Sequence, residues 1–367
     1  MTTAYLDSVK DFLVTHVSHQ ANDYDNAGVI PEDLLARGRE IGLFSQIPLT
    51  PEEFWRSHEL TGYFCSSLRS LQTVNNMGQL ALSKFGSRNL RQYFTEIYPD
   101  NTAPLIAFAL TESHAGSQAT NIQLSATAEG DDYFLTGEKV WVTGATYADW
   151  ILVFATTNTH KHSAFLVAKD SPGLTLSPIE RPYSTRAAGA TSLVLEQCKV
   201  PSMFRLGREG AGLDWVAATC LDLGRYSVAA GALGVAKAAQ DICLDHLSHH
   251  PKDTTPLSSE PQVQTIVADL VTDIQATRAL AESVIVKRTQ QTADATSMTT
   301  LLKYKAARVA NASTYQAMQL VGQRAFRGGS TLERLHRDAQ CLPLIEGTAN
   351  SNAATIAKAA FRGAFER

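Results

Sequence analysis

The chain has 367 residues, of which 44% are hydrophobic and 19% charged, a composition typical of a globular protein with a sizeable core. Its formal net charge of −4 excludes the basic surface that nucleic-acid binding requires. The five cysteines are scattered without a CxxC pair, and the histidines stand at no ligand spacing, so we predict free thiols and no metal site.

The N-terminal segment alternates charged and apolar residues as an amphipathic helix does, and it lacks the pattern of a signal peptide. The longest stretch of small apolar residues, 227–236, is well short of the roughly 20 residues that span a membrane. These features predict a cytoplasmic protein with no membrane partner.

The hydrophobic period changes twice along the chain. In residues 1–103, apolar residues recur every three or four positions, which predicts a helical domain. Residues 104–205 contain short β-rich runs between turn residues, which predict an antiparallel barrel or sandwich. Within this region, YFLTGEKVWVT predicts two strands around a turn at Thr136 and Gly137.

The pattern of residues 206–367 is again typical of helices. The chain is therefore predicted to have an α+β fold in three parts: helices, then β-strands, then helices. The predicted helices are Leu213 to His249, Gln262–Gln290, Thr299–Gln323, and a last one that begins near Asn350. Asn350, Ser351 and Asn352 are all suitable N-caps for this last helix.

Three segments carry residues suited to chemistry. Glu346 follows the apolar run LPLI, and burial of a carboxylate raises its pKa. In FALTESHAGSQAT, Gly116 and Ser117 could form an anion-binding turn, although this stretch taken alone favours an ordinary Gly-Ser turn. In KVWVTG, Trp141 and Thr143 share a strand face that would suit a planar ring or a protein core.

Together these segments resemble the acyl-CoA dehydrogenase family of flavoproteins. Six stretches follow the family's order, namely ALTESHAGS, LTGEKVWVTGATYADWILVFA, LDLGRYSVAAGALGVAKAA, AMQLVGQRAF, LERLHRDA and LIEGT. The resemblance implies an N-terminal helical domain, a middle β domain and a C-terminal four-helix bundle. It also implies FAD, with the flavin ring between the β domain and the bundle.

The resemblance also assigns roles by position. The residues that would contact FAD are Phe108, Leu110, Thr111, Gly116, Ser117, Trp141, Thr143, Gln319, Gly322, Thr348 and Asn350, with Gln319 and Gly322 reaching the cofactor of a partner subunit. Those that would contact substrate are Ser117, Arg225 and Gly347. A homodimer or homotetramer and a separate electron acceptor are implied as partners.

Glu346 occupies the family's position for the base that removes the α-proton of a thioester while a hydride leaves the β-carbon. Some relatives take the base from the long helix, at the position before its arginine. Here that position is Gly224, before Arg225, so the rival base is absent.

Two stretches depart from the family pattern. The segment 249–264 lacks the usual arginine and phenylalanine that brace the partner's FAD, with His250 or Lys252 as possible replacements for the charge. The glycine-rich stretch after Gln319 is altered at 322–325. Both changes predict that FAD is held more weakly than is usual in the family.

The loop after IGLF is shortened to SQIPLTPEEF. The stretch CSSLRSLQTVNNM, together with TCLDLGRYSVA, most resembles dehydrogenases of polyketide and nonribosomal peptide pathways, which include antibiotic biosynthesis. Those enzymes oxidise small acyl groups on an acyl carrier protein to make hydroxymalonyl- or aminomalonyl-type extender units. Two alternatives stay open: a catabolic short-chain acyl-CoA dehydrogenase, and a non-catalytic relative that binds acyl groups or carrier proteins.

Overall fold

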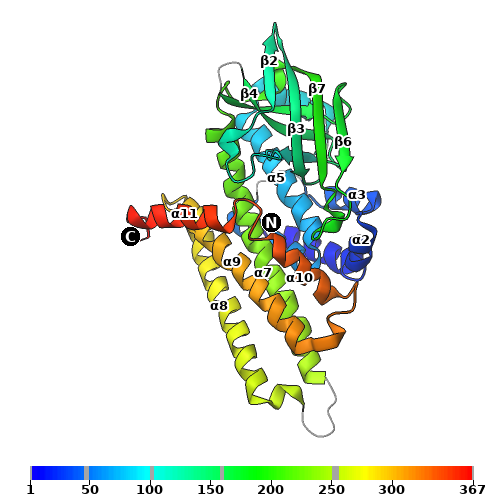
Figure 1. Ribbon diagram of the computed structural model, residues 1–367, viewed down its shortest axis with the longest axis vertical. Coiled ribbons are helices and arrows are strands. Elements are labelled where there is room, and N and C mark those ends of the chain that lie inside the picture. The colour runs from blue at the N-terminus through cyan, green and yellow to red at the C-terminus, as the bar shows by residue number, and fades with distance from the viewer. Residues whose placement is uncertain (1, 45–48, 100–102, 158–160, 250–255, 366–367) are drawn as a thin grey trace.

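The computed structural model describes residues 2–44, 49–99, 103–157, 161–249 and 256–365. Figure 1 shows a β-sheet at one end of the molecule and long helices at the other, with α5 (Ser66–Phe85) between them. No helix in the described ranges is both long and apolar enough to cross a membrane. The segments 45–48 and 250–255, which hold part of the shortened loop together with His250 and Lys252, lie outside the described residues.

The helices before the sheet match the predicted helical region. They are α1 (Thr2–Phe12), followed by a π-helical turn (Leu13–Val17), α2 (Ala21–Ala27), α3 (Glu32–Glu40), α4 (Pro51–Phe64), α5 and α6 (Arg88–Ile97). Thr50 caps α4 in a reciprocal pair with Glu53, which satisfies backbone N–H groups at the helix start.

The strands form one sheet in the described residues. They are β1 (Ile106–Ala109), β2 (Ser125–Glu129), β3 (Asp132–Val142), β4 (Trp150–Thr157), β5 (His162–Ala168), β6 (Leu174–Pro178), β7 (Thr191–Pro201) and β8 (Arg205–Leu206). The strand order is β6-β7-β3-β2-β4-β5-β8, and β1 pairs with β4. The prediction of antiparallel pairing is wrong for two pairs, because both β1 and β2 run parallel to β4. Parallel neighbours need a longer connection than a hairpin, and the intervening chain provides it.

The stretch predicted as two strands is a single strand, β3. Gly137 lies at a bulge instead of a turn, where the pairing of β3 with β7 shifts register. A Cβ at Gly137 would lie 2.8 Å from the backbone of Leu124, so the close approach of the loop requires glycine here. A second register shift lies between Lys139 and Val142, and it includes Trp141, whose φ is +57°. The sequence pattern predicts that Trp141 and Thr143 share one face of a regular strand. The structure shows that they do not, because the strand is irregular at Trp141.

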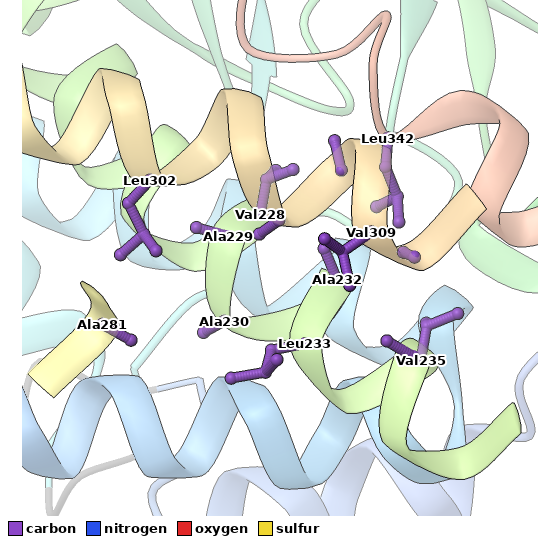
Figure 2. Packing of buried hydrophobic residues seen from close by; sticks show 14 of the residues in the cluster. Val228, Ala229, Ala230, Ala232, Leu233, Val235, Ala281, Leu302, Val309 and Leu342 are labelled. Carbon is purple, nitrogen blue, oxygen red and sulfur yellow. The ribbon is translucent and has the colours of Figure 1, made fainter. Parts of the chain in front are cut away.

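The C-terminal helices are α7 (Ala218–His249), α8 (Pro261–Thr289), α9 (Ala295–Val321), α10 (Thr331–Cys341) and α11 (Ala349–Phe361), and a π-helical turn (Gly212–Ala217) precedes α7. Figure 2 shows Val228 and Ala232 of α7 in one packed cluster with Leu302 and Val309 of α9. Small residues let α7 approach its neighbours closely. A Cβ at Gly234, for example, would lie 2.1 Å from the carbonyl oxygen of Glu59 on α4.

The last helix begins at Ala349, and its N-cap is Thr348, whose hydroxyl accepts a hydrogen bond from the N–H of Ser351. The prediction of a cap at residues 350–352 is therefore wrong by at least two positions. Asn352 turns back toward the preceding turn, where its side-chain amide donates to the carbonyl of Gly347. Because α11 begins at Ala349, the residues just before Thr348 form a tight connection between α10 and α11.

Candidate active site

The connection between α10 and α11 holds Glu346 in an uncommon backbone conformation. Glu346 has a φ of +53° and Gly347 a φ of +95°, so two consecutive residues adopt the left-handed region. Lys303 on α9 donates to the Gly347 carbonyl at 2.8 Å, and Asn352 donates to the same oxygen at 3.0 Å. Strained residues persist only when their surroundings fix them, and these two contacts hold the turn.

The carboxylate of Glu346 is directed into the protein, against α7. Its Oε2 atom is buried and has no hydrogen-bond partner among the described residues. A Cβ at Gly224 would lie 2.4 Å from this oxygen and 3.0 Å from the sulfur of Met77 on α5. Glu346 therefore fills the space beside Gly224, at the contact of α5 with α7.

Burial raises the pKa of Glu346 to about 7, and the cations Arg225, Lys303 and Arg69 limit the rise. A carboxyl with such a pKa is protonated and deprotonated in similar amounts near neutral pH. An unpartnered carboxylate with this property can accept a proton from a bound molecule, which is the requirement for a general base.

Sequence reasoning missed Lys303, the neighbour of Glu346 on α9. Its side chain is buried, and burial lowers its pKa to about 8, with the Glu346 carboxylate opposing that change. A lysine among the apolar residues of a helix core was the available signal. Arg225, which the sequence assigned to substrate, lies on α7 with its buried Nε unpartnered. Both cations favour negative charge at Glu346.

On the sheet side, the structure brings together several residues that the sequence assigned to the flavin. Phe108 lies in β1 with its ring 5.0 Å from that of Phe154. The carbonyl of Leu110 accepts from Lys139, and the carbonyl of Thr111 accepts from the N–H of Val140. These bonds hold the segment after β1 against the end of β3, where Trp141 and Thr143 follow.

A buried ion pair, which sequence reasoning also missed, stabilises the contact between the segment after β1 and the end of β3. Lys139 and Glu112 lie 2.7 Å apart, and both side chains are buried. The Glu112 carboxylate also accepts from the N–H groups of Gln123 and Leu124 at 2.7 and 3.0 Å. The Glu112 carboxylate therefore joins the two ends of the loop that carries Gly116 and Ser117, and Lys139 ties this carboxylate to β3.

The surface beside this junction is open. Trp141 is 60% exposed, although burial of an indole is strongly favourable, and a Cβ at Gly116 would meet nothing within 4 Å. Ser117 is also exposed. An exposed indole next to accessible backbone and hydroxyl groups fits a flat aromatic ring with a polar tail, so these residues fit FAD.

The other residues assigned to the cofactor lie in two places. Thr348 and Asn350 are next to Glu346, with Asn350 exposed at the start of α11. Gln319 is exposed near the end of α9, and Gly322 terminates that helix with a φ of +67°. Gln319 follows Lys303 by 16 positions, which is about 24 Å along a helix, so it lies far from Glu346 of its own chain.

Comparison with known proteins identifies the family of this chain. Residues 107–198 match the model for the middle domain of acyl-CoA dehydrogenases, and residues 210–361 match the model for the C-terminal domain. A probable acyl-CoA dehydrogenase of Bacillus subtilis, YngJ, is 31% identical over 96% of each chain. The chain belongs to the acyl-CoA dehydrogenase family. It is thus a member of a family of FAD-dependent oxidoreductases.

Two solved structures are similar over nearly the whole chain. Butyryl-CoA dehydrogenase from Megasphaera elsdenii has a TM-score of 0.92, with 25% identity over 98% of both chains. FkbI, described as acting in biosynthesis of the methoxymalonyl extender unit of the polyketide FK520, has a TM-score of 0.87, with 28% identity over 98% of this chain and 99% of that one. The predicted fold and the family resemblance are confirmed.

Proposed function

We propose that this acyl-CoA dehydrogenase family member oxidises a small acyl thioester carried on an acyl carrier protein, with Glu346 as the base. The observation that carries the proposal is the buried Oε2 of Glu346, which has no partner and lies beside Gly224. A general base needs a lone pair that is free for the substrate proton and a pKa near the working pH, and Glu346 has both.

Each neighbour of Glu346 has a part in this proposal. Glu346 takes the α-proton, and the nearby Arg225 and Lys303 limit the rise of its pKa so that the ionised form is populated. Gly347, held by Lys303, fixes the direction of the carboxylate. When FAD is bound, it supplies the acceptor for the hydride that leaves the β-carbon of the substrate.

We also propose where the cofactor binds. Phe108, Leu110 and Thr111 line the edge of the flavin, Trp141 and Thr143 contact its ring, and the 116–117 turn contacts its phosphates. Thr348 and Asn350 complete the site from the bundle side. Gln319 and Gly322 reach the FAD of a partner subunit in a homodimer or homotetramer, which accounts for their distance from Glu346. A separate protein accepts the electrons.

Replacement of Glu346 by Gln tests the base assignment. Glu346→Gln keeps the size of the side chain but cannot accept a proton, so we expect normal folding and flavin content with no bleaching of the flavin by substrate. Glu96→Gln, on the exposed face of α6, is the matched control and should bleach normally. Unchanged bleaching in Glu346→Gln would rule out this residue as the base.

Support for the carrier-protein tether comes from the resemblance of CSSLRSLQTVNNM to dehydrogenases of polyketide pathways and from the full-length similarity, at 28% identity, to FkbI, which acts in biosynthesis of a polyketide extender unit. The similarity to butyryl-CoA dehydrogenase at 25% identity favours the second candidate, a short-chain acyl-CoA dehydrogenase. Presenting one acyl group both as a CoA ester and on a carrier protein separates the two. We expect a higher kcat/KM on the carrier protein, and efficient turnover of free butyryl-CoA would instead support the second candidate.

A further inference from the structure

The 183–189 loop, which lies within the connection from β6 to β7, is held by two consecutive residues of α10. The buried carboxylate of Asp338 accepts a hydrogen bond from the N–H of Thr185 at 2.7 Å. Arg337 donates to the carbonyl of Tyr183 at 3.0 Å. Both bonds are made to backbone atoms of the loop, so α10 fixes the path of the loop and not merely one of its side chains.

The same loop is bonded on its other side to the turn that follows Thr143. The N–H of Gly144 donates to the carbonyl of Ala188 at 2.9 Å, and the hydroxyl of Tyr147 donates to the carbonyl of Ala187 at 3.0 Å. Thr143 belongs to the proposed flavin contacts. The 183–189 loop therefore connects the flavin side of the site to α10 through hydrogen bonds at both of its ends.

The loop has a backbone conformation that needs such support. Thr185 has a φ of +47°, a left-handed conformation that β-branched residues rarely adopt. Such a residue persists only when its surroundings fix it, and Asp338 binds the N–H of this residue. Burial raises the pKa of Asp338, which reflects the cost of keeping a carboxylate away from water. A costly group that holds a strained loop indicates a role beyond stability.

The helix that holds the loop also leads to the proposed base. α10 ends at Cys341, and the chain reaches Glu346 five residues later. Asn311 of α9 donates to the carbonyl of Ala339 at 2.7 Å, which fixes the end of α10 against the helix that carries Lys303. A displacement of α10 relative to the sheet would therefore displace the base relative to the flavin contacts.

We propose that Asp338 is a positioning residue, which sets the distance between the Glu346 carboxylate and the flavin ring through Thr185 and the 183–189 loop. This inference rests on the proposed function, because a base and a hydride acceptor must both reach one substrate. The two groups are held by different parts of the fold, the bundle and the sheet. Rates fall steeply when reacting groups are misplaced by about 1 Å, so a fixed connection between the two parts favours catalysis.

Hydrogen exchange of the purified protein, with and without added FAD, gives the first readout. Asp338→Ala removes the acceptor for the Thr185 N–H, whereas Asp338→Asn retains an oxygen that can accept it. We expect Asp338→Ala to speed amide exchange in the 183–189 loop and also at Gly144, which bonds to the loop and not to Asp338. Asp338→Asn should keep the exchange of the wild type at both places.

The second readout is the first-order rate constant of flavin bleaching at saturating substrate. This constant does not depend on the fraction of protein that is folded, so a loss of stability alone lowers the amplitude and leaves the constant unchanged. We expect it to fall roughly 10- to 100-fold in Asp338→Ala, with little change in KM, and to stay near wild type in Asp338→Asn. Adding Thr185→Gly to Asp338→Ala should restore part of the rate, because glycine adopts a positive φ without support.

Asn22→Ala is the matched control. Asn22 accepts from Arg334 of α10 at 2.8 Å, but this bond joins α10 to α2 and not to the sheet. The variant should keep the rate constant of the wild type and its exchange at Gly144.

A wild-type rate constant in Asp338→Ala, or faster exchange confined to α10, would overturn the inference. If Asp338→Ala fails to fold, Tyr147→Phe takes its place, because it removes the bond to Ala187 on the sheet side of the loop. It should then lower the same rate constant, and an unchanged constant would overturn the inference equally. Failure of every acyl thioester to bleach the wild-type flavin would instead contradict the proposed function itself.

Discussion

The carboxylate of Glu346 occupies the space that any side chain at position 224 would need. A Cβ on Gly224 would lie 2.4 Å from Oε2 and 2.6 Å from Cδ of Glu346, which is closer than real atoms approach. The sequence offered Gly224 only as the absence of a rival base. The structure gives it a positive role, because the glycine makes room for the carboxylate on the bundle side.

Gly224→Ala should therefore displace Glu346 from its position. An added methyl group favours the helix by about 1 kcal/mol, so we expect the protein to fold and to keep its flavin. A displacement of about 1 Å at a catalytic group can cost roughly 100-fold in rate, and we expect a loss of that order in flavin bleaching. Gly328→Ala, where a Cβ would meet nothing within 4 Å, is the control. Full activity in Gly224→Ala would contradict the steric argument.

The rate of flavin bleaching should rise with pH and level off above about pH 7, because only the ionised form of Glu346 accepts a proton. Lys303→Met removes a cation that favours this ionised form, so the rise should move to higher pH. Lys305→Met, which affects an exposed ion pair with Asp273, should leave the profile unchanged. A profile that stays in place in Lys303→Met would show that the lysine acts only on the turn at Gly347.

The buried carboxylate should also affect stability. The pKa of Glu346 is about 7 in the folded protein against 4.5 as its ordinary value, so ionisation opposes folding as the pH rises from 4.5 to 7, and the full penalty remains above 7. A shift of this size corresponds to at most about 3.5 kcal/mol. Glu346→Gln should thus be more stable than wild type at pH 8, with a smaller difference at pH 5. Urea unfolding at both pH values measures this, and equal differences would contradict it.

The ion pair between Lys139 and Glu112 should be essential to the flavin side of the site. Lys139→Met leaves the Glu112 carboxylate buried without its cation, which typically costs about 3–5 kcal/mol. We expect a lower melting temperature and a loss of bound flavin, with partial recovery in the double variant that adds Glu112→Gln. Lys199→Met removes an exposed ion pair with Asp132 and should cost less than about 1 kcal/mol. Equal effects of the two lysine variants would contradict this role.

FAD should be retained less firmly than is usual in the family, because the 249–264 and 322–325 segments differ from the family pattern at contacts with the partner's cofactor. Purified protein should contain flavin below one equivalent and recover absorbance when FAD is added. Stoichiometric FAD that survives dialysis would count against this prediction.

Much of the fold could be predicted from the sequence, because local periodicity reports which face of each element is buried. The change from helical to β period and back, the long helices after residue 206 and the apolar approach to Glu346 are all local patterns. The family resemblance added the order of the segments. Local patterns are less informative where the chain departs from regular geometry, which is why the sequence predicts a turn at Gly137, where the structure has a bulge, and does not identify Thr348 as the cap of α11.

The sequence by itself determined that one carboxylate follows an apolar run and that position 224 has no side chain. Only the tertiary structure decided that these two residues touch, and that Lys303, Met77 and Arg69 surround the same helix contact. The physical reason is that these residues come from α5, α7, α9 and the turn before α11. Their proximity depends on close packing of small residues between helices, which no local period in the sequence encodes.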